Sequence, residues 1–183
     1  MSPELEVPTS IELRMRRFEA RSQLTELISR YCVALDDRDF VALKRLFAED
    51  AQFNAIRGRD AILNLFRKQT ASFGPCYHYA HAHHFDFDSD ESAAGTVNGH
   101  AEVAFKGETM WMGLRYLDRY ACTGGRWYFQ SRTLKVRYAL PFTEMGTLYG
   151  DALRQRWPGA KPRAADIPDT LDTYIASRTD SIR

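Results

Sequence analysis

The chain has 183 residues, a length that fits one domain and requires no second hydrophobic core. Its 25 Lys and Arg residues balance 24 Asp and Glu residues, so no excess charge favours a nucleic acid or an anionic membrane as partner. The three cysteines are widely spaced without a CxxC pair, which argues against a disulfide framework or a zinc knuckle.

Residues 1–9 have the composition of a flexible tail. They are acidic and polar, not basic and then apolar as in a secretory signal, and no apolar run approaches the roughly 18 residues of a membrane span. We therefore expect a cytoplasmic protein.

The first half of the chain predicts helices. One runs from about residue 11 to 35 behind Ser10 as N-cap, with a short second helix after Asp39 and a third over about 58–70. Residues 51–54 fit a short strand between the last two. The apolar stripe of the first helix consists of Leu24, Leu27, Ile28, Tyr31 and Leu35, and that of the second of Phe40, Leu43, Leu46 and Phe47.

The second half predicts a sheet, because from Gly74 the apolar period changes from about 3.6 to 2. Turn signals divide it into four strands, at about 76–88, 92–106, 109–122 and 126–138. Short turns between long strands imply antiparallel pairing, and helices followed by strands imply the α+β class. A long antiparallel sheet curls, and its concave side is filled by helices or left as a pocket.

The end of the chain is less regular. Pro141 ends the last predicted strand, and residues 142–154 carry a weak helical pattern. Beyond Trp157 we expect an extended or partly helical arm that covers the pocket mouth or a neighbouring subunit. The predicted organisation is thus a domain over residues 10–140 and a C-terminal helix and arm over residues 141–183.

Two residues of the first predicted helix are candidates for chemistry. Asp36 lies near its C-terminal end, where the helix dipole disfavours a carboxylate, so a buried Asp36 needs a cation or a hydrogen-bond donor. The alternative is a helix cap or a surface acid. Tyr31 lies five residues earlier, about 140° around an ideal helix, so both can flank one broad pocket-facing side. An ordinary core tyrosine is the alternative.

Residues 77–85 hold four of the five histidines, which raises the possibility of a metal site. His81 and His83 would share one face of a strand, and His-x-His is a known metal-ligand spacing. A third ligand, from His100 or Glu102 on the next strand, is not fixed by the sequence, so we predict no metal.

His78 is a different case. It shares a strand face with the small Ala80 and Ala82, which leave the room that a pocket residue needs, although a structural histidine is the alternative. Arg132, in the last predicted strand, either forms a structural ion pair or presents its guanidinium to an anionic group or a developing oxyanion.

Several segments resemble SnoaL-like members of the nuclear transport factor 2-like superfamily. The opening matches at residues 30–40 (RYCVALDDRDF), 46–51 (LFAEDA) and 58–62 (GRDAI), and the last two strands match at 113–120 (GLRYLDRY) and 125–132 (GRWYFQSR). The resemblance implies a cone-shaped, curved antiparallel sheet closed by N-terminal helices, a cystatin-like α+β barrel. It agrees with the fold class inferred from periodicity.

This superfamily includes cyclases, dehydratases, isomerases, dehydrochlorinases and noncatalytic subunits. The chain resembles the group of bile-acid 7α-dehydratase, scytalone dehydratase and hexachlorocyclohexane dehydrochlorinase, which uses an aspartate late in the first helix and a histidine on the first long strand. Asp36 and His78 fall at these positions. Tyr31 matches the tyrosine of the bile-acid enzyme, and Arg132 an arginine of the last strand.

The chain departs from scytalone dehydratase at two positions. Leu35 replaces a tyrosine of that enzyme and Val103 replaces a second histidine, so scytalone is not the expected substrate.

The resemblance implies a lyase of the dehydratase type that needs no cofactor. Asp36 would orient His78 and raise its basicity, and His78 would remove a proton activated by a carbonyl or aromatic system. Tyr31 would donate to the leaving hydroxyl or hold the carbonyl, and Arg132 would stabilise the developing anion.

The expected substrate is a small hydrophobic, steroid-, terpene- or aryl-like molecule. The candidate substrate-binding residues are Tyr77, Phe85, His100, Glu102, Trp111 and Tyr116.

Other functions remain open on the sequence alone. The same dyad could serve a polyketide-type cyclase, an isomerase or a carbon–carbon lyase, and the fold also suits an inert ligand-binding protein or the noncatalytic small subunit of a ring-hydroxylating dioxygenase. The convex face of the sheet predicts a homotrimer or homodimer, because alternate apolar residues would otherwise be exposed.

Overall fold

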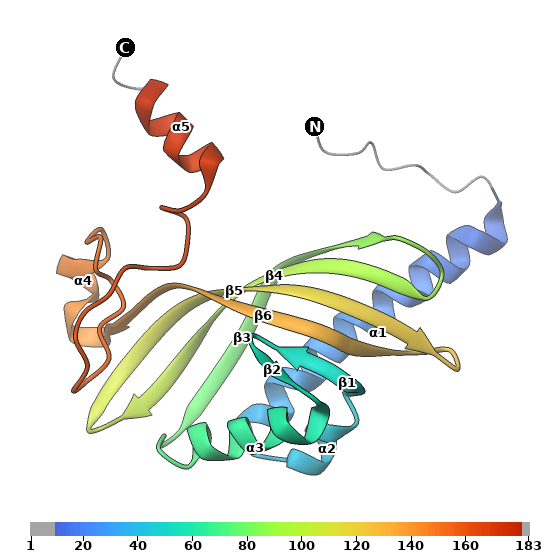
Figure 1. Ribbon diagram of the computed structural model, residues 1–183, viewed down its shortest axis with the longest axis horizontal. Coiled ribbons are helices and arrows are strands. Elements are labelled where there is room, and N and C mark those ends of the chain that lie inside the picture. Colours follow the sequence, from blue (N-terminus) through green and yellow to red (C-terminus); the bar gives the residue numbers. More distant parts are fainter. Residues whose placement is uncertain (1–9, 181–183) are drawn as a thin grey trace.

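The computed structural model describes residues 10–180, with side chains as far as residue 178, and it has the predicted α+β architecture (Figure 1). The predicted tail at residues 1–9 lies outside the described residues. The elements are α1 (Ile11–Asp36), α2 (Phe40–Lys44), β1 (Phe47–Phe53), β2 (Ile56–Arg57), α3 (Arg59–Thr70), β3 (Cys76–Phe87), β4 (Ser92–Phe105), β5 (Glu108–Thr123), β6 (Arg126–Pro141), the 3₁₀ turn η1 (Phe142–Glu144), α4 (Met145–Leu148) and α5 (Asp172–Asp180).

The long N-terminal helix α1 begins at the predicted cap. The Ser10 hydroxyl accepts a hydrogen bond from the backbone N–H of Leu13 at 3.2 Å, and the predicted apolar stripe from Leu24 to Leu35 is buried against the sheet. Asp39 then caps α2 by accepting from the N–H groups of Val41 and Ala42. The Asp39 cap therefore starts α2 directly after the short turn that follows the C-terminal end of α1.

The second helix is shorter than its apolar pattern suggested. It ends at Lys44, and Phe47 begins strand β1 instead of ending a helix, so the predicted strand at residues 51–54 starts four residues early. Phe47 packs against Phe129 of β6, with ring centroids 5.2 Å apart. This tertiary contact overrides the local helical period.

The six strands form one curved, open, mixed sheet in the order β2-β1-β6-β5-β4-β3. The four predicted strands are confirmed as the antiparallel meander from β3 to β6. Strand β1 adds a parallel partner to β6, with Phe53 opposite Arg132. Helices α1 and α3 lie on one side of the sheet, where they bury an aromatic core around Tyr31, Phe66 and Phe129 (Figure 1).

Strand β3 contains a bulge that changes which histidines share a face. His78 pairs with Ala101, but the register shifts after Ala80, so that His83 pairs with the buried Val97. His78 and His83 therefore both face the helices, while His81 lies on the outer face. The prediction that His81 and His83 share a face is wrong, because an extra residue resets the alternation.

After β6 the chain is mostly irregular. The helix predicted over residues 142–154 is present only as η1 and α4, which end at Leu148. The chain then returns along the sheet, where Gln155 forms isolated bridges with Ala139 and Arg163. In the part of the chain that the structure describes, no helix is long and apolar enough to cross a membrane.

Candidate functional site

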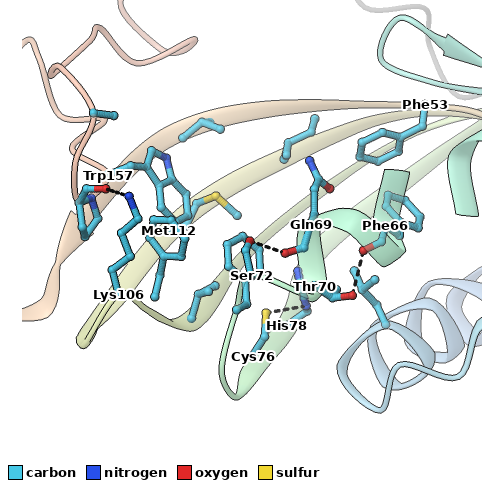
Figure 2. Close-up of a pocket in the computed structure, with 18 of the residues that line it drawn as sticks. Phe53, Phe66, Gln69, Thr70, Ser72, Cys76, His78, Lys106, Met112 and Trp157 are labelled. Carbon is cyan, nitrogen blue, oxygen red and sulfur yellow. Dashed lines mark hydrogen bonds between the residues drawn. The ribbon is translucent and has the colours of Figure 1, made fainter. Parts of the chain in front are cut away.

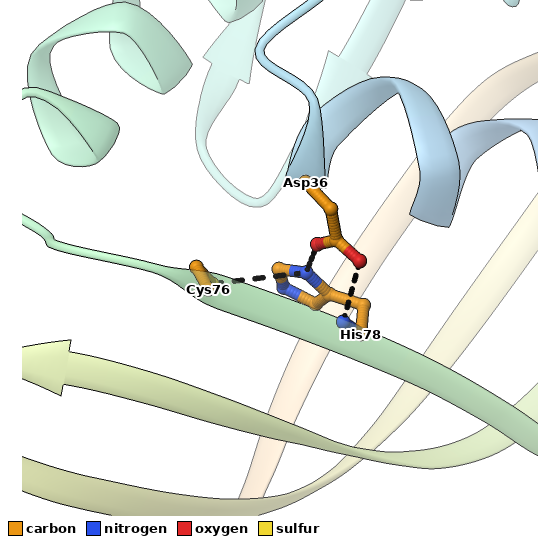
Figure 3. Close-up of side chains that lie close together, drawn as sticks. All are labelled: Asp36, Cys76 and His78. Atoms are coloured by element: carbon orange, nitrogen blue, oxygen red, sulfur yellow. Dashed lines mark hydrogen bonds and ion pairs between the residues drawn. The ribbon is translucent and has the colours of Figure 1, made fainter.

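Asp36 and His78 meet at the junction between α1 and β3 (Figure 3). Asp36 is the last residue of α1, and its Oδ1 lies 2.6 Å from Nδ1 of His78, while its Oδ2 accepts from the backbone N–H of His78 at 2.8 Å. The side chains are only 16% and 12% exposed, respectively. One carboxylate thus fixes both the imidazole ring and the strand that carries it.

This contact determines how the imidazole can act. A carboxylate accepts hydrogen bonds, so the neutral ring carries its proton on Nδ1 and has a lone pair on Nε2. A lone pair on Nε2 is what a general base needs.

Cys76 completes a group of three side chains around this pair. Its Sγ lies 3.9 Å from Nδ1 of His78, and among residues 10–178 these three are the one set of metal-ligating groups within 4.8 Å of one another. Burial, and then the charge of Asp36, raise the pKa of Cys76 to about 12. The Cys76 thiol is therefore protonated at neutral pH, and the short contact in this group is the one between Asp36 and His78.

His78 lines a cavity of about 490 Å³, within the size range of small-molecule sites (Figure 2). The cavity lies between the end of α1, helix α3 and the sheet. Its wall is mainly apolar, with Phe53, Phe66 and Met112 among its residues, and Gln69, Thr70 and Ser72 at the end of α3 are polar.

The segment after β6 supplies another part of the wall. Trp157 stacks on Phe73, with ring centroids 6.2 Å apart and planes 12° apart, and meets Phe105 edge-on at 5.8 Å. Lys106 donates to the carbonyl oxygen of Pro158 at 3.3 Å. Residues 157–160 and Arg163 therefore face the same cavity as His78.

Tyr31 and Tyr116 both line the cavity and are almost fully buried. Burial raises the pKa of Tyr31 to about 12, against the opposing effect of the Arg132 charge. Burial, and then the proximity of Tyr31, raise the pKa of Tyr116 well above its ordinary value. Both phenols therefore remain protonated at neutral pH and can donate hydrogen bonds.

Arg132 forms the structural ion pair that was one of its two possible roles. Its Nε and Nη2 donate to the two oxygens of Asp118 at 2.9 and 2.7 Å, and both side chains are fully buried. Burial disfavours the guanidinium charge, but the attraction of Asp118 outweighs it and raises the pKa of Arg132. The guanidinium carbon lies 4.3 and 4.1 Å from the ring centroids of Tyr31 and Tyr116.

Arg132 also borders a second, much smaller cavity. This void of about 10 Å³ is lined by His78 and Tyr116 as well as Arg132, whose Nη1 has no hydrogen-bond partner in the described part of the chain. Arg132 is not among the residues that line the larger cavity.

The sequence-predicted substrate-binding residues are not brought together. Tyr116 lines the 490 Å³ cavity, but the other five do not. Phe85 is buried in the core with its ring centroid 5.8 Å from that of Tyr120, and Tyr77 is 51% exposed. His100, Glu102 and Trp111 lie on the outer sheet face, since it is their neighbours Ala101, Val103, Met110 and Met112 that are buried. Strand alternation alone could not tell which face was inward.

His100 nevertheless has close partners on the outer face. Its Nδ1 lies 2.7 Å from Nε2 of His81, and its Nε2 lies 3.6 Å from Oε1 of Glu102. His81 and His100 share the outer face, and the bulge in β3 separates them from His83, which contacts Thr25 of α1.

The cavity residues Gln69, Ser72, Lys106, Trp157 and Arg163 were not identified from the sequence. Gln69 continues the helical pattern of α3 and could have been found from it. Lys106 lies in a tight turn with a positive φ of 50°, and Trp157 and Arg163 belong to an irregular segment, so no periodicity indicates where they point.

Comparisons with known proteins agree with this architecture. Residues 16–133 match the family model described as the SnoaL-like domain. A structure of LinA is 21% identical, covers 70% of this chain and 93% of its own, and has a TM-score of 0.67. A putative scytalone dehydratase from Novosphingobium aromaticivorans is 20% identical, with coverage of 70% and 91% and a TM-score of 0.65.

A third structure is hexachlorocyclohexane dehydrochlorinase LinA-type3 from Novosphingobium barchaimii. It is 18% identical, covers 70% of this chain and 94% of its own, and has a TM-score of 0.66. No curated protein sequence matches the chain. At these identities the structures establish the fold alone, while the family model covers well over half of the chain. The chain therefore belongs to the SnoaL-like domain family of the nuclear transport factor 2-like superfamily.

Proposed function

We propose that the chain is a lyase of the dehydratase type that needs no cofactor, with His78 as general base and Asp36 as the residue that positions it. The observation that carries this proposal is the two-point contact of Asp36 with the ring and backbone of His78, at the wall of a mainly apolar cavity. A base of this kind acts on a C–H bond beside a carbonyl or an aromatic system, where the resulting carbanion is stabilised.

The proposed step is an elimination. Nε2 of His78 takes the proton, the C–H electron pair forms the new double bond, and the hydroxyl on the neighbouring carbon leaves with its own bonding pair. Tyr31 or Tyr116 donates a proton to that hydroxyl, so the products are an alkene and water. Asp36 stabilises the imidazolium that forms. Acid and base help of this kind contributes about 10²–10⁴-fold to a rate.

Arg132 has an indirect part in this proposal. Its charge is neutralised by Asp118, but it lies against the faces of the Tyr31 and Tyr116 rings. A cation there favours a phenolate over a phenol, which makes both hydroxyls better proton donors. Arg132 is therefore a positioning residue that assists the developing anion through the two tyrosines.

The comparisons favour an elimination over the other reactions of this fold. Two of the similar structures bear the names of a dehydratase and a dehydrochlorinase, and each name describes the removal of a small group from a substrate. The fold by itself does not choose between them and a cyclase, an isomerase or a noncatalytic protein. The proposal of an elimination therefore rests on His78 acting as a general base.

The test is turnover of a panel of hydroxylated ketosteroids and aryl-propanoids, with loss of water followed by mass spectrometry. We expect the wild type to dehydrate at least one member, and His78→Ala to lower kcat by about 10²–10⁴-fold. His84→Ala is the matched control, since His84 is exposed on the same strand and does not line the cavity. If the wild type turns over a substrate and His78→Ala retains its rate, the proposed base is wrong.

A further inference from the structure

The charged residues of the large cavity all have the same sign. Lys106, at the turn after β4, and Arg163, in the segment after β6, both line it, and no aspartate or glutamate among the described residues does. Two carboxylates contact lining residues from outside the cavity: Asp36 is bound to the ring of His78, and Asp166 accepts from the backbone N–H of Val136 at 2.7 Å. Within the part of the chain that the structure describes, this mainly apolar cavity therefore has two cations in its wall and no carboxylate.

Neither cation has an acidic partner among the residues that the structure describes. Nζ of Lys106 donates to the carbonyl oxygen of Pro158 and lies 5.3 Å from the ring centroid of Phe105, and Nε of Arg163 donates to Oε1 of Gln155 at 3.1 Å. Within residues 10–178 neither cation lies within 4 Å of a carboxylate oxygen. Each thus has donors left for a ligand, because an ammonium carries three N–H groups and a guanidinium five.

The charge of Lys106 lies at one end of the cavity (Figure 2). Phe53 and Phe66 lie at one end, Lys106 lies beside Trp157 at the other, and His78 lies between them. A ligand that fills this space meets aromatic carbon at both ends, because Phe73 and Phe105 pack against Trp157, but it meets the charge of Lys106 only at the Trp157 end. The reacting carbon would lie between these ends, next to the base.

We propose that Lys106 and Arg163 form an anion subsite, and that the substrate is a hydrophobic carboxylic acid whose carboxylate binds there. This inference rests on the proposed function in one respect: it takes the 490 Å³ cavity as the substrate site. A carboxylate is fully ionised at neutral pH, and it matches the ammonium and guanidinium donors at the rim. The apolar skeleton then extends past His78 towards Phe53 and Phe66.

Lys106 also has a structural role, which the test must separate from the effect of its charge. By holding the carbonyl of Pro158 it ties the turn after β4 to the segment that carries Trp157. Loss of that tie would weaken the binding of every ligand, charged or neutral. Loss of an anion subsite would weaken only the binding of the acid, so the ratio of acid to ester affinity distinguishes the two roles.

The experiment is a fluorescence titration with 1-pyrenebutyric acid and its methyl ester, which share one apolar body and differ in charge. We expect the wild type to bind the acid about fivefold or more tightly than the ester, as a charge-assisted contact at an exposed rim predicts. The preference should shrink as salt is added. It should be lost in Lys106→Met/Arg163→Met, remain largely intact in Lys106→Arg and be unchanged in Lys161→Met. Lys161 is exposed on the same segment and does not line the cavity.

Three results would contradict the proposed anion subsite. The wild type could bind the acid no more tightly than the ester, or the double variant could keep the preference for the acid. The variants could also lower the affinity for the acid and the ester by the same factor. The titration needs no turnover and is repeated on His78→Ala. An inert protein that prefers the acid would leave the subsite standing and contradict the enzyme. A protein that dehydrates a substrate but binds the acid and the ester equally would support the enzyme and contradict the anion subsite.

Discussion

The guanidinium of Arg132 is a positive charge with no access to solvent. It is held between the two oxygens of Asp118 and the faces of Tyr31 and Tyr116. Tyr120 donates to the same Asp118 at 2.7 Å, so that the carboxylate is bonded from two sides. Such a pair adds little to stability compared with apolar residues of the same size, but removing one partner leaves the other charge uncompensated.

We therefore predict that Asp118→Leu lowers the free energy of unfolding by about 3–5 kcal/mol, measured by urea denaturation. The double variant Asp118→Leu/Arg132→Met should recover much of that loss, because no charge is then stranded. Asp88→Asn removes an exposed partner of Arg119 and should leave the unfolding midpoint almost unchanged. If Asp118→Leu lowers the free energy of unfolding no more than Asp88→Asn does, the account of the buried pair is contradicted.

The sequence predicted individual elements well where local signals and burial agree. The first helix, the third helix and the four long strands follow from period and turn residues, and Ser10 and Asp39 cap the predicted helices. Asp36 and His78 could be paired only through the resemblance to a family. They are 42 residues apart, and no spacing rule joins a helix end to a strand.

Other features depend on tertiary contacts. The bulge after Ala80 moved His83 to the inner face, although nothing in residues 77–85 marks the extra residue. Phe47 joined a strand because it packs on Phe129, and Trp157 reached the cavity through a segment without periodicity. In each case the side chain's place is set by residues distant in the sequence.

At the scale of the whole molecule, the buried tyrosines make stability depend on alkaline pH. The pKa of Tyr31 is raised in the folded state to about 12, against 10.0 for the free side chain. Below pH 10 the phenol is protonated in both states, so its contribution is fully present. As pH rises through 12 the unfolded state ionises first, and a contribution on the order of 2 kcal/mol is lost.

This loss can be measured by urea denaturation between pH 9 and pH 12. The free energy of unfolding should fall more steeply for the wild type than for Tyr31→Phe, which has no phenol to ionise. Equal slopes for the two proteins would show that Tyr31 does not hold its proton in the folded state.

The outer face of the sheet is a second whole-molecule feature. Tyr77, Tyr79 and Leu117 are exposed there, as the prediction of a homotrimer or homodimer requires. The assembly remains a prediction, and sedimentation velocity of the purified chain would measure it.

The central claim is that a carboxylate holds the proton of His78 on Nδ1 and frees Nε2 for the cavity. Nitrogen-15 NMR of the imidazole measures this directly. We predict that neutral His78 shows a protonated Nδ1 and an unprotonated Nε2, and that Asp36→Asn disturbs this pattern while the other histidines keep theirs. A wild-type His78 protonated on Nε2, or one that Asp36→Asn leaves unchanged, would contradict the account.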